Sequence, residues 1–157
     1  MRRTLIVGLL AAVAGSSPAA AQGARTWLFD DSSDVVTLQY GTPESDDVVV
    51  AMSCEANTRT VRINEFASSN SLTPGRTAKL KLTNGSASIE YNGQALANEM
   101  DGGVNLEVVT PADAKLFALL KAGPSLTIDV AGKQATVPLK AAAPHLTALE
   151  KACLTKR

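Results

Sequence analysis

Three glutamates are the side chains best placed for acid–base chemistry in this sequence. Glu65, Glu90 and Glu107 each lie in a stretch of alternating apolar and polar residues, and we assign all three to the polar side. Glycoside hydrolysis requires two carboxyl groups across a cleft, roughly 5–10 Å apart. A carboxylate-dependent cell-wall or sugar hydrolase is therefore one alternative function. One Trp, two Tyr and three Phe leave few aromatic side chains to line a sugar-binding cleft.

His145 is the only histidine and hence the only imidazole that could serve as a general base beside a serine. The chain has no Gly-x-Ser-x-Gly motif to present such a serine. His145 also follows Pro144 at the start of an expected helix, where we expect exposure to solvent. We therefore predict that the protein is not an enzyme and has no catalytic residues.

Six acidic residues with no Lys or Arg among them lie between positions 30 and 47. They are Asp30, Asp31, Asp34, Glu44, Asp46 and Asp47. Like charges repel, so these residues either occupy solvated loops or meet a basic partner surface. The first of them, within Asp-Asp-Ser-Ser-Asp at 30–34, lack the central glycine and closing glutamate of a calcium loop. We predict no metal or cofactor and treat the six as candidates for partner binding.

The start of the chain predicts export. Two arginines precede an apolar run at residues 4–15, and alanines at positions 19 and 21 precede an expected cleavage site before Gln22. The apolar run is shorter than the roughly 18–20 residues that a membrane span needs. We predict a signal peptide at 1–21 and a single periplasmic β-rich domain at 22–157, with secretion as the alternative location and no stable membrane span after cleavage.

Cleavage also changes the charge balance. The full chain has 15 basic and 15 acidic residues, and loss of Arg2 and Arg3 leaves 13 basic residues against 15 acidic ones. Nucleic-acid binding depends on a basic surface. The composition therefore argues against a nucleic-acid partner.

The two cysteines, Cys54 and Cys153, predict one disulfide, because an exported chain with two cysteines most simply joins them. Cys54 ends an apolar run, and Cys153 shares a helical face with Leu146 and Leu149. That face must pack on the sheet. The bond would close a loop of about 100 residues and would pin the last helix. A redox-active site is not indicated, since there is no Cys-x-x-Cys.

Alternating apolar and polar residues predict strands along most of the mature chain. The expected strands are 25–29, 34–40, 46–54, 59–66, 76–83, 86–91, 104–110, 125–130 and 134–139. Asn84-Gly85 and Asn92-Gly93 each predict a two-residue hairpin turn, in which both residues adopt positive φ. A further hairpin is expected around Ala131-Gly132-Lys133. The hairpins together predict a β-meander.

Helical periodicity replaces alternation in two segments, about 111–122 and 143–154. For the first helix, Thr110 offers a capping hydroxyl and Pro111 suits the first turn. Gly123-Pro124 ends it. We therefore predict a mainly β fold: an antiparallel sandwich or curved meander sheet with two packed helices.

Three features together resemble the layout of small periplasmic two-cysteine proteins in the type VI secretion-associated accessory family. They are the apolar strand that ends in Cys54, the stretch 116–153, and Trp27 near the mature start. Met52-Ser53 stands where an arginine often precedes the strand cysteine in that family. The resemblance implies a non-enzymatic accessory domain. A weaker likeness is to exported invasion-associated proteins of alphaproteobacteria, whose closely spaced cysteine pair is absent here.

These features predict a non-enzymatic exported protein with a binding or accessory role and a periplasmic or envelope protein as its partner. The hydrolase is one alternative. A periplasmic inhibitor or stress-protective protein that acts through a loop is the other.

Overall fold

The computed structural model describes residues 23–55, 58–98 and 102–155. The expected signal peptide, 1–21, lies outside them. The strands are β1 Thr26–Asp30, β2 Val35–Gly41, β3 Val48–Glu55, β4 Thr60–Glu65, β5 Thr77–Asn84, β6 Ala87–Ala97, β7 Val104–Pro111, β8 Ser125–Val130 and β9 Lys133–Pro138. A short 3-10 turn, η1, spans Ser69–Ser71, and the helices are α1 Ala114–Lys121 and α2 Ala143–Leu154.

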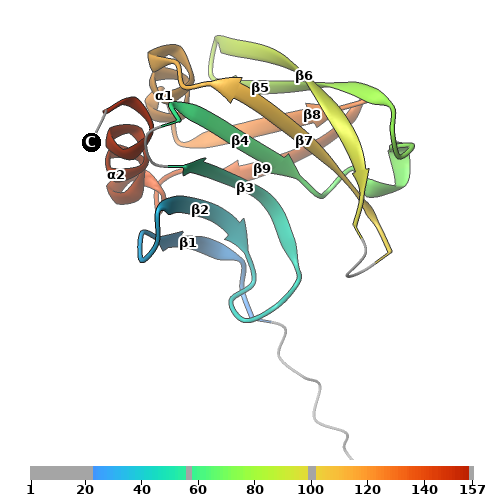
Figure 1. Ribbon diagram of the computed structural model, residues 1–157, viewed down its shortest axis with the longest axis horizontal. Helices are drawn as coiled ribbons and strands as arrows, with labels where there is room; N and C mark the ends of the chain where they lie inside the picture. The colour runs from blue at the N-terminus through green and yellow to red at the C-terminus, as the bar shows by residue number, and fades with distance from the viewer. Residues whose placement is uncertain (1–22, 56–57, 99–101, 156–157) are drawn as a thin grey trace, which may run out of the picture.

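The strands form one antiparallel sheet with the order β1-β2-β3-β4-β7-β6-β5-β8-β9. The sheet curls strongly, and both helices lie side by side at one end of the curl (Figure 1). The curl brings its two edge strands together at one point, where the Trp27 indole of β1 donates a hydrogen bond to the Pro138 carbonyl of β9 over 2.5 Å. The predicted mainly β fold with two packed helices is thus confirmed as a curved sheet.

The core fills the concave side of the curl, because alternate residues of each strand point inward. Leu38, Met52, Ile63 and Leu106 are among the fully buried side chains there. Helix α2 covers β2 and β3, and α1 packs on α2, β5 and β6. The helices therefore close the end of the curl at which β3 ends, one residue after Cys54.

The hairpin signals were only partly correct. Ala131 and Gly132 both have positive φ and form the two-residue turn between β8 and β9, as predicted. The turn between β5 and β6 lies one residue later than predicted, since Asn84 pairs with Ala87 and leaves Gly85 as the first turn residue. Asn84 keeps its strand position because its buried amide donates to the main-chain carbonyl of Leu119 at the end of α1, over 2.9 Å.

The predicted hairpin at Asn92-Gly93 is wrong, since β6 runs straight through it. Gly93 is needed there for space. A Cβ at this position would lie 2.8 Å from the Glu107 carbonyl oxygen and 2.9 Å from side-chain atoms of Leu106 and Val108. The glycine thus permits close approach between β6 and β7, a common role of glycine inside a strand.

The first helix begins later than predicted. Thr110 and Pro111 belong to β7, which pairs with β4 up to Pro111. The cap is Asp113, whose carboxylate accepts a hydrogen bond from the Lys115 main-chain nitrogen over 2.9 Å. Pairing in the sheet therefore takes precedence over the local helix-start signal. The second helix has the predicted bounds, 143–154.

Candidate functional site

The six acidic candidates do not form one patch. Asp30, Asp31 and Asp34 lie at the β1–β2 hairpin, whereas the other three lie at the β2–β3 turn. The whole of β2 separates the two groups. A strand of seven residues is roughly 20 Å long, well beyond the Debye length of about 8 Å at physiological salt. The two groups therefore act as separate charges.

At the β2–β3 turn, Asp47 is neutralised by a cation from outside the acidic stretch. Arg25 donates to both Asp47 carboxylate oxygens, over 2.7 and 2.8 Å, and the Thr42 hydroxyl donates to one of them over 2.8 Å. These hydrogen bonds, with the Arg25 charge, lower the pKa of Asp47 to about 2. The Glu44 and Asp46 side chains form no hydrogen bond or ion pair within the described ranges.

At the β1–β2 hairpin, Asp30 organises the turn. Its carboxylate accepts hydrogen bonds from the main-chain nitrogen of Ser32, over 2.9 Å, and from the Ser32 hydroxyl, over 2.6 Å. The hydroxyl and the main-chain N–H of Ser32 both lower the pKa of Asp30. Asp31 and Asp34 form no polar side-chain contact with any residue that the structure describes. They are free charges on an ordered turn.

A groove of about 280 Å³ lies beside this hairpin, between it and α2. Its lining residues are Phe29, Asp31, Val36, Ala148, Lys151, Ala152 and Thr155. The Phe29 ring stacks on His145, with ring centroids 4.9 Å apart. His145 is half-buried, so the expected exposure to solvent is only partly met. The groove joins an apolar floor to one free carboxylate and one lysine.

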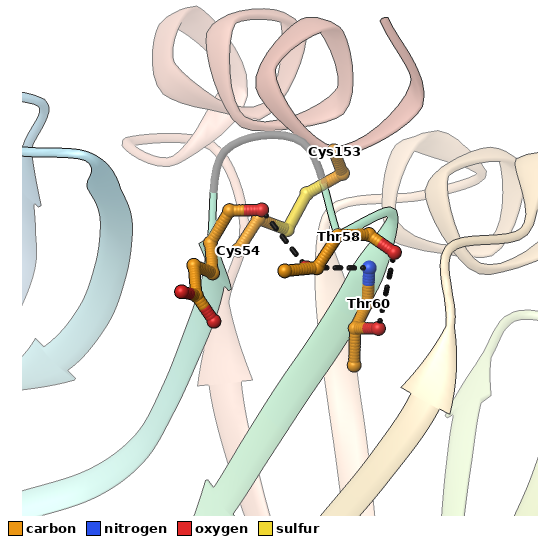
Figure 2. The surroundings of a disulfide bond; sticks show 5 residues. Cys54, Thr58, Thr60 and Cys153 are labelled. Atoms are coloured by element: carbon orange, nitrogen blue, oxygen red, sulfur yellow. Dashed lines mark hydrogen bonds between the residues drawn. A yellow bond between two sulfur atoms is a disulfide. The ribbon is translucent and has the colours of Figure 1, made fainter. Parts of the chain in front are cut away.

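A disulfide holds the helix that forms one wall of the groove. Cys54 and Cys153 are bonded as predicted, with their Cα atoms 5.4 Å apart, and each is 1% exposed. Figure 2 shows the bond joining the end of β3 to the last turn of α2, next to the Thr58–Thr60 turn. Val36 of the groove floor is the strand partner of Cys54. The bond therefore fixes α2 against the strand beside the floor.

The three glutamates proposed for hydrolysis do not face one another. Glu65 was wrongly assigned to the polar side: it follows Val61 and Ile63 on the concave face and is 1% exposed. Glu107 is paired with Arg62, and Glu90 with Lys79, and both pairs are accessible to solvent. A carboxyl pair across a cleft is thus absent among these residues.

No metal or membrane feature emerges from the part of the chain described. Residues 23–55, 58–98 and 102–155 contain no group of three or more His, Cys, Asp or Glu side chains placed to hold a metal ion. The same ranges include no helix that is long and apolar enough to cross a membrane.

The fold is similar to that of a solved structure. No family model and no curated protein matches this chain. The crystal structure of invasion associated protein B from Bartonella henselae is similar, with 22% identity over 80% of this chain and 94% of that chain, and a TM-score of 0.47.

The apolar periodicity of α2 marks only its buried face, with Leu146, Leu149 and Cys153, and so does not single out the groove residues of this helix. Ala148, Lys151 and Ala152 occupy the other side of the same helix. Two small residues beside a lysine on an otherwise polar face were the available signal. The groove can therefore bury an apolar side chain of a binding partner, with the charges of Asp31 and Lys151 beside it.

Proposed function

We propose that this protein is an exported, non-enzymatic binding protein, which holds a basic segment of a periplasmic or envelope protein. The binding surface is the hairpin–α2 groove together with Asp31 and Asp34. The observation that carries this proposal is a contrast within the acidic stretch: Asp47 is paired with Arg25, whereas Asp31 lines an apolar groove and has no polar side-chain partner among the described residues.

Charge and shape support the same type of partner. A free carboxylate pair attracts a basic partner over about one Debye length and raises its association rate. The floor residues Phe29 and Val36 offer burial to an apolar side chain of that partner. Location in the periplasm and an accessory role of the type VI secretion kind remain predictions. The disulfide fits an oxidising compartment outside the cytoplasm.

Site-specific photo-cross-linking in cells tests this function. A photoreactive residue replaces Ala148, an exposed position in the groove, and the matched control places it at Ser45, an exposed position on the β2–β3 turn. We expect a cross-linked protein from position 148 that is absent from position 45. Equal products from both positions, or none from 148, would contradict the proposed surface.

A further inference from the structure

Glu65 is a carboxyl group placed in an apolar row. It is the last residue of β4, and on the concave face it lies between Val50 of β3 and Leu106 of β7. Its exposure is only 1%. Burial without full compensation penalises a charged group much more than a neutral one. The proposed partner site does not use this residue.

The hydrogen bonding of Glu65 is incomplete. Its Oε1 contacts the Ser68 hydroxyl over 3.2 Å, while its Oε2 has no hydrogen-bond partner within the described chain. Burial raises the pKa of the Glu65 carboxyl, and the hydrogen bonds from Ser68 and the Ala67 main chain offset this only in part. An unpaired oxygen of a neutral acid costs less than an unpaired oxygen of a carboxylate.

Among the described residues, the strands on either side of Glu65 place no opposite charge next to it. The neighbouring strands present Val50 and Leu106 to Glu65, and Tyr40, one strand beyond Val50, is the next titratable side chain in the row. Arg25 and Asp47, which lie at this end of the sheet, form an ion pair with each other. The pKa of Glu65 carries no contribution from another charged group among the described residues.

Residues 66–76 connect β4 to β5 at this end of the sheet, and Ser68, near the start of the segment, contacts Glu65. Main-chain hydrogen bonds tie both ends of the segment, from Phe66 to Val49 over 3.0 Å and from Gly75 to Ala95 over 2.8 Å. Between these ties, η1 packs on β7, and Ser68 is 4% exposed where it meets Glu65.

We propose that buried Glu65 is a proton-controlled latch for segment 66–76: the segment stays closed over the carboxyl while Glu65 is protonated, and it opens when Glu65 ionises, because the Ser68 hydrogen bond only partly offsets the cost of burying the charge. Because the carboxyl is more readily protonated in the closed state than in the open one, the closed state binds more protons. Closure is therefore complete below the ordinary Glu pKa of 4.5. It weakens as the pH rises through the raised pKa of the folded protein.

Hydrogen exchange with mass spectrometry on the full mature chain tests the latch between pH 5 and 8, after correction for intrinsic exchange rates. We expect protection of residues 66–76 to fall as the pH rises, by up to about tenfold per pH unit while opening is accompanied by the loss of one proton. Glu65→Gln keeps the shape and removes the charge, so its protection should stay constant. Glu107→Gln is the matched control, since it makes the same change at the solvent-accessible pair with Arg62. In this variant the protection of residues 66–76 should fall with pH as in the wild type.

Two outcomes would overturn the latch. One is wild-type protection of 66–76 that does not change with pH, and the other is an equal fall in Glu65→Gln. If Glu65→Gln does not fold, NMR titration of the Glu65 carboxyl carbon in the wild-type protein decides instead. A raised pKa supports the latch, and a pKa at or below 4.5 refutes it.

Discussion

At the β2–β3 turn, Asp47 binds Arg25 and Thr42, whereas at the β1–β2 hairpin Asp31 and Asp34 face solvent without a partner in the described chain. Both turns belong to one stretch of sequence that contains no basic residue. Their surroundings differ. Arg25, which precedes β1, reaches the β2–β3 turn, whereas the groove with α2 lies next to the β1–β2 hairpin. Local charge density therefore says little about which carboxylates are free to bind.

The largest loss of stability should follow removal of the Cys54–Cys153 disulfide, which holds α2 beside the hairpin. Replacing Cys54 and Cys153 together by Ala should reduce the free energy of unfolding by about 2–4 kcal/mol, because the unfolded chain loses its cross-link. Urea unfolding measures the loss. We expect local exchange to rise first in α2 and the hairpin, with the Arg25–Asp47 turn unchanged.

Reduced wild-type protein is the matched control, since it lacks the bond but keeps both side chains. Native protein should show no free thiol by alkylation and mass spectrometry. Quantitative alkylation of both thiols in the native protein would contradict the disulfide and the fixed groove wall.

A smaller loss of stability is expected when the Arg25–Asp47 pair at the β2–β3 turn is broken. Asp47→Asn should cost about 0.2–1 kcal/mol at pH 5, because its ion pair with Arg25 is half-exposed and screened. The pKa of Asp47 is lowered to about 2, so this stabilisation is present above its ordinary pKa of 3.8 and disappears as the pH falls through about 2. Thermal unfolding between pH 5 and 2 measures it.

Asp46→Asn is the control at the same turn, since the Asp46 side chain has no polar contact within the described ranges. It should leave stability unchanged. If Asp46→Asn costs as much as Asp47→Asn, the turn responds to general charge and not to the Arg25 pair.

The smallest loss of stability is expected when the stack between His145 and Phe29 is removed. His145→Ala should lower the free energy of unfolding by about 0.5 kcal/mol, the low end for an aromatic pair, because the stack on Phe29 is partly exposed. His145→Phe should restore most of the loss. A cellular defect of His145→Ala at normal protein abundance would show that the imidazole has a chemical role.

Much of the fold could be predicted because alternation along a strand directly reports which face is buried. The same rule places Glu65 in the core, two positions after Ile63. The assignment of Glu65 to the polar side is wrong because it follows residue type, and a carboxyl group is rarely buried. The Asn92-Gly93 signal failed for another reason. Glycine serves both turns and close strand contacts, and only the packing of Leu106 and Val108 reveals which applies.

The candidate site was less predictable, since it depends on distant residues. Arg25 precedes Asp47 by 22 positions, and the groove joins Phe29 to Ala152 at the far end of the chain. Neither contact has a local sequence signal. The disulfide was predictable because an exported chain with two cysteines leaves one pairing.

Association kinetics of two charge-matched variants test the proposed surface most directly. Asp31→Asn with Asp34→Asn removes two charges at the hairpin, and Glu44→Gln with Asp46→Asn removes two at the turn. Against the partner captured at position 148, the hairpin variant should associate roughly threefold more slowly at low salt, and the difference should shrink at high salt. The turn variant should associate like the wild type. Equal rates for both variants at low salt would contradict a partner surface at the hairpin.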